Sequence, residues 1–192
     1  KMRFWNIGAE GQICAGAIAA SYFAYFHNYL PREVLLPVMA VAAIAAGGLW
    51  GLLPAVFKTR FGTNETLFTL MLNYIVGYFI TFLREGPWRN PEGGFAATPR
   101  FEKQARLPDA WFPGVGNIHI GWIVMLVMVL AVFIYLRYTK QGYEIAVVGE
   151  NVNTARYAGM PVSKIILRTM FLSAGLCGLV GMLQVAGPDR QL

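Results

Sequence analysis

Polar side chains that can bind a small solute occur at a few points in otherwise apolar stretches of this sequence. Glu10 and Gln12 stand just before a long apolar run, where the positive end of a helix dipole favours a carboxylate. Two polar residues, an aromatic one and a glycine lie inside apolar runs: Asn73, Gln184, Tyr74 and Gly77. Because polar groups that face lipid are costly, these residues predict either the lining of a solute path or hydrogen bonds between helices.

The pattern around Asn73 is the most informative of these. Polar or small residues recur there at steps of three and four: Thr66, Thr69, Asn73, Gly77 and Thr81. This spacing puts them on one face of a helix. That face has to meet protein or a water-filled path, and we expect Asn73 to be its most polar member.

The sequence lacks the motifs of several common enzyme classes. It has no GxxxxGKS/T phosphate loop, no HExxH and no GxSxG. His27 and His119 stand alone, and Cys14 and Cys177 lie inside apolar runs, where they are typical packing residues. We therefore expect a protein that is not an enzyme, uses no cofactor and binds no metal ion.

The chain that carries these residues has 192 positions, of which 56% are hydrophobic and 14% are charged. Runs of about 20 apolar residues can cross the roughly 30 Å hydrocarbon core of a bilayer as helices, which satisfy their own backbone hydrogen bonds. Such spans are predicted near residues 9–29, 34–55, 66–83, 119–136 and 165–186. The predicted fold class is all-α, a single polytopic membrane domain with about five transmembrane helices.

Two long connectors separate the later spans. The connector 84–117 contains five prolines and five aromatic residues, and we expect it to fold back on the membrane surface. The connector 139–164 is polar, and its middle predicts a short helix. Asn151 suits the N-cap, Gly159 suits the left-handed C′ position, and Pro161 stops the helix. The alternative interpretation is a solvated loop with one helical turn.

The net charge of +6 does not indicate a nucleic-acid partner. The basic residues are scattered over the connectors and form no face with interleaved aromatic residues. With residues 139–164 on the cytoplasmic side, nine Lys and Arg residues lie inside and seven outside. The positive-inside rule therefore favours this orientation only slightly, and membrane lipid is the surrounding partner that the composition predicts.

Three stretches in the expected order resemble one family of membrane proteins. They are FWNIGAEGQ at residues 4–12, KTRFGTNETLFTLMLNYI at 58–75 and GENVNTARYAGM at 149–160. Together they resemble the permeases of ABC importers of the branched-chain amino acid, simple sugar and nucleoside group, with the nucleoside-type branch as the best match. The resemblance covers nearly the whole chain.

The resemblance implies a transport subunit of a bacterial inner membrane. Separate ABC ATPase subunits would hydrolyse ATP, a second permease subunit would complete the path, and an external substrate-binding protein would deliver the solute. The chain would be the central part of such a permease, without its first span or spans and its C-terminal helices. The long connector 84–117 would then lie outside the cell, and the connector 139–164 inside.

The resemblance also implies site residues. Glu10, Gln12 and the polar residues of the later spans would line or flank the translocation path. The short helix would be the coupling segment that touches the ATPase, through Glu150, Asn151, Val152, Ala155, Arg156, Tyr157 and Gly159. Among these we expect Val152, Ala155, Arg156 and Tyr157 to make the contacts.

Several functions remain open at this point. The solute can be a nucleoside, and simple sugars or branched-chain amino acids are the alternatives within the same family. A secondary transporter or channel is disfavoured because the spans are nearly free of charge. A membrane scaffold without transport activity would not need the polar stripe around Asn73.

Overall fold

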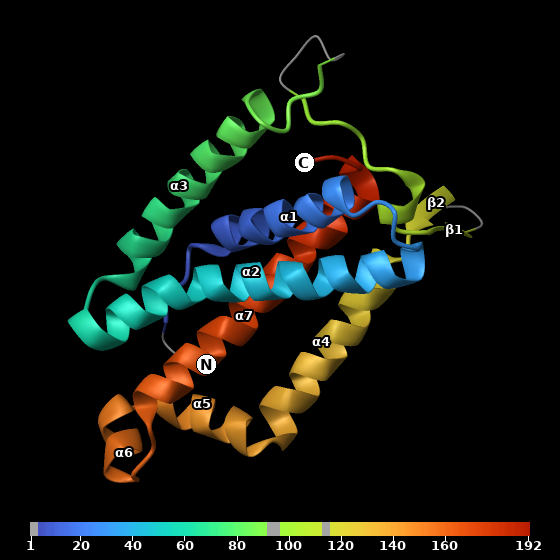
Figure 1. The fold of residues 1–192 in the computed structure, drawn as a ribbon. Helices are drawn as coiled ribbons and strands as arrows, with labels where there is room; N and C mark the ends of the chain where they lie inside the picture. Colours follow the sequence, from blue (N-terminus) through green and yellow to red (C-terminus); the bar gives the residue numbers. More distant parts are fainter. Residues whose placement is uncertain (1–3, 92–96, 113–115) are drawn as a thin grey trace.

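The computed structural model describes residues 4–91, 97–112 and 116–192, and the side chains of residues 110–118 are outside this description. Seven α-helices occur in it: α1 (Ala9–Phe26), α2 (Arg32–Phe61), α3 (Glu65–Glu85), α4 (Gly121–Tyr138), α5 (Lys140–Glu150), α6 (Val152–Tyr157) and α7 (Val162–Gln184). Figure 1 shows α1, α2 and α7 crossing at the centre, with α3 on one side and α4 on the other.

The helical fold class is confirmed, with one addition. The connector between α3 and α4 contains a 3-10 turn, Lys103–Ala105, and an antiparallel hairpin of two short strands, β1 (Asp109–Phe112) and β2 (Gly116–His119). Asp109 pairs with His119 in the register of the hairpin. The sequence did not predict strands here, because each has only four residues.

Four helices are long and apolar enough to cross a membrane among the residues described: Arg32–Phe61, Glu65–Glu85, Gly121–Tyr138 and Val162–Asp189, the last including a π-helical turn after α7. They coincide with four of the five predicted spans. The fifth, predicted near residues 9–29, is the 18-residue helix α1. Glu10 and Gln12 in its first turn lower the mean hydropathy of α1. Helices α2 and α7 also cover α1, so only part of its surface is left to face the bilayer.

Small residues allow the three central helices to approach closely. Gly16 of α1 and Gly47 of α2 both lie against Gly178 of α7. A Cβ atom built on Gly47 would lie 2.7 Å from the Gly178 Cα and 2.6 Å from the backbone oxygen of Ala174. Backbone contact of this kind is how helices pack in membranes, where the lipid is as apolar as the side chains.

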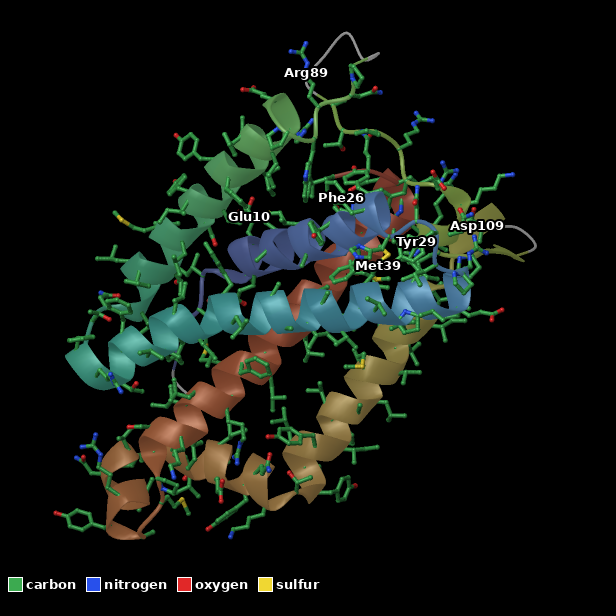
Figure 2. All side chains as sticks on the ribbon, in the orientation of Figure 1. Glu10, Phe26, Tyr29, Met39, Arg89 and Asp109 are labelled. Atoms are coloured by element: carbon green, nitrogen blue, oxygen red, sulfur yellow. The ribbon has the colours of Figure 1, made fainter. Side chains whose placement is uncertain are left out.

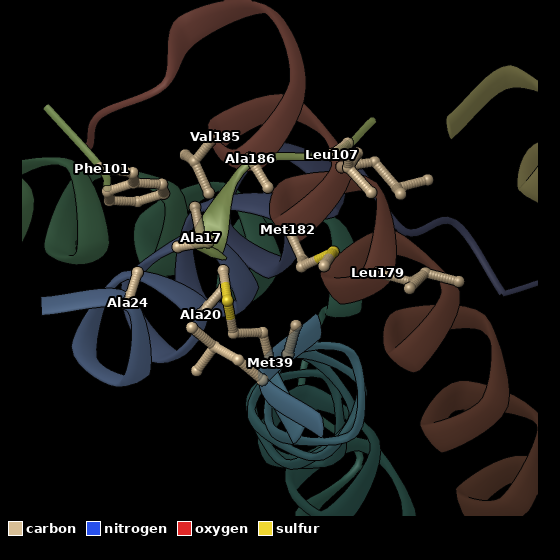
Figure 3. Packing of buried hydrophobic residues seen from close by; sticks show 14 residues of the cluster. Ala17, Ala20, Ala24, Met39, Phe101, Leu107, Leu179, Met182, Val185 and Ala186 are labelled. Atoms are coloured by element: carbon tan, nitrogen blue, oxygen red, sulfur yellow. The ribbon is translucent and has the colours of Figure 1, made fainter. Parts of the chain in front are cut away.

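The main apolar core lies at the end of the central helices where α1 meets α2 and the end of α7 (Figure 3). Ala20 and Met39 are fully buried there, and the connector adds Phe101 and Leu107. Among the aromatic residues of the connector, Phe101 is buried in this core, and Trp88 packs edge-on against Tyr25. Phe95 is outside the described residues, as are the side chains of Trp111 and Phe112.

The connector is also held to the end of α7 by backbone hydrogen bonds. Leu107 N donates to the Ala186 oxygen at 2.9 Å, and Phe101 N donates to the Arg190 oxygen at 2.8 Å. The hydroxyl of Thr98 donates to the Leu192 oxygen and accepts from the Leu192 N–H, both at 3.1 Å. The connector therefore forms a cap on the central helices rather than a free loop.

The turns lie on two opposite faces of the helical layer. We call the face with residues 62–64 and 139–161 the coupling face, and the face with residues 27–31, 86–91, 97–112, 116–120 and 185–192 the connector face. Figure 2 shows Arg89 and Asp109 on the connector face, on the other side of the molecule from α6.

Helix α4 leaves the centre towards the coupling face. Apart from Gly121 its residues are exposed or half-buried in the chain, which fits an apolar span that faces lipid. An apolar hollow of about 590 Å³ separates the middle of α4 from α7. Towards the coupling face, α5 bridges the two helices.

Candidate solute path and coupling segment

The polar residues near the start of α1 lie within the depth of the membrane spans. Asn73 follows Glu65, the first residue of α3, by eight positions, which is about 12 Å along a helix that rises 1.5 Å per residue. Asn73 contacts the start of α1, so α1 begins part of the way across the span. Irregular backbone at this depth occurs where it is buried in protein or lines a water-filled cavity.

Side-chain amides satisfy the backbone where the chain enters α1. Asn73 Oδ1 accepts from Gly11 N at 2.9 Å, and Asn73 Nδ2 donates to the Ile7 oxygen at 3.0 Å. Asn6 Oδ1 accepts from Gly8 N at 2.9 Å. Gln12 is almost fully buried and pairs with the amide of Asn6, with donor to acceptor distances of 3.2 and 3.3 Å. The side-chain amides of three residues therefore hold the chain at the start of α1. We call these residues the α1 entry network (Asn6, Gln12 and Asn73).

Two further groups lie beside this network. Glu10 is exposed, and Figure 2 shows it at the start of α1 on the side that faces α3. The indole Nε1 of Trp50 on α2 is buried, with no hydrogen-bond partner among the described residues. A Cβ atom built on Gly11 would lie 3.3 Å from this nitrogen, so the indole N–H is close to the start of α1. The sequence analysis did not identify Trp50 as a neighbour of these residues, because its position beside Gly11 depends on how α1 and α2 pack.

The other predicted path residues separate into two places. Tyr74 and Gly77 follow Asn73 on α3 and are exposed in this chain, so they continue the surface that begins at the α1 entry network. Gln184 does not join them. It is the last residue of α7, on the connector face, and its side chain is exposed and donates to Asp189 at 3.0 Å.

The short helix predicted in the connector 139–164 forms as α6. Asn151 is the N-cap of α6, and its side chain accepts from Asn153 N at 2.8 Å and from Thr154 N at 3.3 Å. Gly159 has a φ of 73°, the left-handed conformation that follows the end of a helix. Glu150 is the last residue of α5 and is exposed beside the cap. The alternative interpretation, a loop with a stray turn, is wrong.

The connector 139–164 contains a second helix that was not predicted. Thr139 caps α5 by accepting from Gly142 N at 3.2 Å, and the helix continues to Glu150. Residues Ile145 and Val148 of α5 pack with Ile165 of α7 in a separate apolar cluster. A Thr cap and apolar residues three and four apart are the sequence signals that identify such a helix.

Ala155 belongs to this cluster and not to the exposed surface. It is 0% exposed, and it packs with the apolar residues of α5 and α7. The prediction that Ala155 itself touches a partner is therefore corrected, because its methyl group seats α6 on the rest of the chain.

The outer face of α6 is exposed and carries charge and aromatic surface. Tyr157 is 94% exposed, Val152 is 40% exposed, and Arg156 is exposed beside them. An aromatic side chain with this exposure, on a helix whose opposite face is fixed by Ala155, is typical of a surface that contacts another protein.

An α-helical chain with several membrane spans, a polar network inside them and an exposed short helix on one face defines a multi-pass transport subunit. The chain belongs to the family described as branched-chain amino acid transport system, permease component, which it matches over residues 1–191. The family resemblance in the sequence is thus confirmed. The chain is a multi-pass membrane protein of this permease class, whose subunits have no ATPase site of their own.

The names of the individual relatives refer to different solutes. The chain is 32% identical to a glucose ABC transporter permease protein, TsgB13, of Haloferax volcanii, over 97% of this chain and 51% of the relative. It is 30% identical to a guanosine ABC transporter permease protein, NupP, of Bacillus subtilis, over 95% of this chain and 52% of the relative. It is 24% identical to a probable riboflavin import permease protein, RfuC, of Treponema pallidum, over 95% of this chain and 48% of the relative.

The chain spans about half the length of these relatives. No solved structure gives a significant match.

Proposed function

We propose that this chain is part of the permease subunit of an ATP-driven importer and that α6 is the surface on which a partner ATPase acts. The observation that carries this proposal is the exposed outer face of α6, with Tyr157 and Arg156, on a helix seated by Ala155. The guanidinium of Arg156 is suited to a carboxylate on the ATPase, because its planar fork can bind both carboxylate oxygens. A second permease subunit and an external substrate-binding protein complete the proposed importer.

Movement of α6 reaches the solute path through short, hydrogen-bonded segments. Met160 N donates to the Ala155 oxygen at 3.0 Å and Val162 N donates to the Met160 oxygen at 2.9 Å, so the link from α6 to α7 has little slack. Helix α7 then contacts the backbone of α1 at Gly181, against Ile13. A tilt of α7 therefore displaces the start of α1, where the α1 entry network lies.

Arg156→Glu tests the proposed contact in the full-length permease, reconstituted with its ATPase and binding protein. We expect insertion and abundance to be unchanged and ATP-driven uptake to be lost, because a carboxylate would repel the carboxylate that Arg156 binds. Arg60→Glu is a matched control, an exposed arginine on the same coupling face at the end of α2. Normal uptake by Arg156→Glu would contradict the proposal.

Cysteine crosslinking tests the same contact directly. A cysteine at Tyr157 should capture the ATPase subunit, whereas one at Tyr143, which is 64% exposed on α5, should not. A requirement for ATP in vesicle uptake separates this importer from a secondary transporter. Uptake that follows an ion gradient without ATP would favour the secondary transporter.

We further propose that the solute is a nucleoside. The similarity to the guanosine permease supports it, as do Tyr74 and Tyr78, which are 63% and 76% exposed on α3 and whose rings can stack on a base. The similarity to the glucose permease favours a simple sugar as the second candidate. Uptake of radiolabelled guanosine, with unlabelled glucose as competitor, distinguishes the two. Uptake of radiolabelled glucose without uptake of guanosine would replace the nucleoside by a sugar.

A further inference from the structure

An ion pair joins α5 to α7. Its residue Glu144 is next in sequence to Ile145, which belongs to the apolar cluster that buries Ala155 of α6; we call this cluster the seat of α6. Arg168 Nη2 lies 3.0 Å from Glu144 Oε2, and the two side chains are 33% and 17% exposed. Arg168 Nε is buried and has no hydrogen-bond partner in the described part of the chain, and the contact of Arg168 with Glu144 runs through Nη2. Partial burial shields the pair from solvent, which makes it stronger than a pair on an open surface.

The pair adds direction to a contact that is otherwise apolar. Ile145 and Val148 of α5 pack with Val162 and Ile165 of α7, and Ala155 of α6 lies in the same cluster. Apolar burial is not directional and permits one helix to slide on another. A hydrogen-bonded ion pair fixes which turn of α5 faces which turn of α7.

The other end of α5 is held by α4. The hydroxyl of Thr139 donates to the Tyr135 oxygen at 2.6 Å and accepts from Gly142 N, and a Cβ atom at Gly142 would collide with the backbone of Leu136. Without the ion pair, α5 would remain joined to α4 through this corner while its packing on α7 loosened. A force on α6 would then move α5 with α4, and it would reach α7 only through the short link between α6 and α7.

We propose that Glu144 and Arg168 are positioning residues that fasten α5, and with it the seat of α6, to α7, so that displacement of α6 is passed to α7. This inference rests on the proposed role of α6 as the surface on which an ATPase acts. It adds that the efficiency of transmission depends on an ion pair that itself touches neither the ATPase nor the solute.

A charge swap separates this role from another use of Arg168. Arginines near the end of a membrane helix can also bind lipid phosphate. Arg168→Glu removes both interactions. The double variant Glu144→Arg with Arg168→Glu restores the ion pair with reversed polarity, whereas a carboxylate at position 168 repels phosphate. If the double variant restores the behaviour of the unaltered protein, the effect of Arg168→Glu came from the loss of the ion pair and not from the loss of a contact with lipid phosphate.

The first measurement uses the full-length permease without its ATPase. Spin labels on cysteines at Thr154 of α6 and Leu172 of α7, both exposed, report the distance between the two helices. We expect a narrow distance distribution in the otherwise unaltered protein, a broad one in Glu144→Arg and in Arg168→Glu, and a narrow one again in the double variant. Because the ATPase is absent, this result does not depend on whether α6 contacts it.

The second measurement uses the reconstituted importer with radiolabelled guanosine and radiolabelled glucose as probes. The amount of probe taken up per ATP hydrolysed should fall about tenfold in each single variant, since reversing one partner of a shielded pair leaves two like charges together. It should return to within about twofold in the double variant, while copurification of the ATPase stays unchanged throughout.

The pair between Lys58 and Glu65 is the matched control. Its atoms lie 2.6 Å apart on the same coupling face, with side chains 38% and 14% exposed, but it joins α2 to α3. Lys58→Glu should leave the distance between α6 and α7 unchanged. A narrow distribution in Arg168→Glu, or a double variant as broad as the single ones, would overturn the inference. Normal uptake by Arg156→Glu, together with a narrow distance distribution in the double variant at Glu144 and Arg168, would instead contradict the proposed role of α6 and leave the fastening of α5 to α7 intact.

Discussion

The side-chain oxygen of Asn73 accepts a hydrogen bond from the backbone N–H of Gly11 at 2.9 Å, across 62 positions of sequence. The same amide donates to the oxygen of Ile7 at 3.0 Å. One side chain on α3 thus satisfies a donor and an acceptor of the chain that enters α1 at membrane depth. Asn73 is therefore part of the framework of the proposed path as well as of its surface.

Replacing Asn73 by leucine should destabilise the protein as well as reduce transport. Asn73→Leu leaves the N–H of the buried residue Gly11 without a partner, which costs about 1–3 kcal/mol, and it also removes the hydrogen bond to the oxygen of the exposed residue Ile7. Thermal unfolding in detergent should show a lower melting temperature. Thr81→Val on the same helix is the control, because the Thr81 hydroxyl bonds only to the Gly77 oxygen within α3 among the described residues. Equal melting temperatures for the two variants would contradict this role of Asn73.

What could be predicted around Asn73 was the face on which it lies, and not its partner. Spacing of three and four residues identifies one side of a helix, whatever that side meets. The bonds to Ile7 and Gly11 depend on how α3 packs against the start of α1, which no local pattern contains. Trp50 was missed for the same reason, since its indole nitrogen is near Gly11 only in the folded chain.

The left-handed turn after α6 should be sensitive to a side chain. Gly159 has a φ of 73°, and an L-residue in this region costs about 1–2 kcal/mol. Gly159→Ala should therefore increase hydrogen exchange at the backbone of α6. Gly62→Ala is the matched control, because Gly62 has a φ of 65° in the turn between α2 and α3 and neither glycine has neighbours among the described residues that would collide with a Cβ.

Both substitutions should lower stability by similar amounts, but only Gly159→Ala should reduce the uptake obtained per ATP. An equal loss of uptake in Gly62→Ala would show that strain on the coupling face, rather than the position of α6, controls transport.

The coupling segment also shows where local signals are sufficient. Asn151 and Gly159 could be identified from the sequence because a helix cap and a left-handed residue depend only on neighbours a few positions away in the chain. Ala155 was assigned to the wrong surface because its burial is produced by α5, a helix whose apolar residues are too few to stand out in a polar connector. The ion pair between Glu144 and Arg168 was missed for the same reason.

The connector should depend on the hydroxyl of Thr98. This side chain is almost fully buried and bonds to both the N–H and the oxygen of Leu192. Thr98→Val keeps the shape of the side chain and removes both hydrogen bonds. The free energy of unfolding should fall by about 1–3 kcal/mol, and protease should cut the connector of the folded protein more readily. Thr98→Ser keeps the hydroxyl and should resist the protease. Similar digestion of the two variants would show that the packing of Phe101 holds the connector without Thr98.

The last prediction contrasts two glycines in membrane helices. Gly178 lies where α7 meets α2, and a Cβ atom there would collide with the Ala43 oxygen and lie 3.1 Å from the Gly47 Cα. Gly178→Ala should therefore push the helices apart and destabilise the protein by about 1–3 kcal/mol. A Cβ atom at Gly77 on α3 would have no atom of the described residues within 4 Å, so Gly77→Ala should stabilise the helix by about 0.5–1 kcal/mol.

Thermal unfolding of the two alanine variants measures this contrast, and uptake then tests the path. Because Gly77→Ala keeps the fold, a fall in its uptake would reflect a methyl group placed where solute passes, beside Tyr74. Unchanged uptake in this variant would remove Gly77 from the proposed path. A melting temperature of Gly178→Ala equal to that of the unaltered protein would contradict the backbone contact between α2 and α7, through which movement of α7 is expected to reach the rest of the permease.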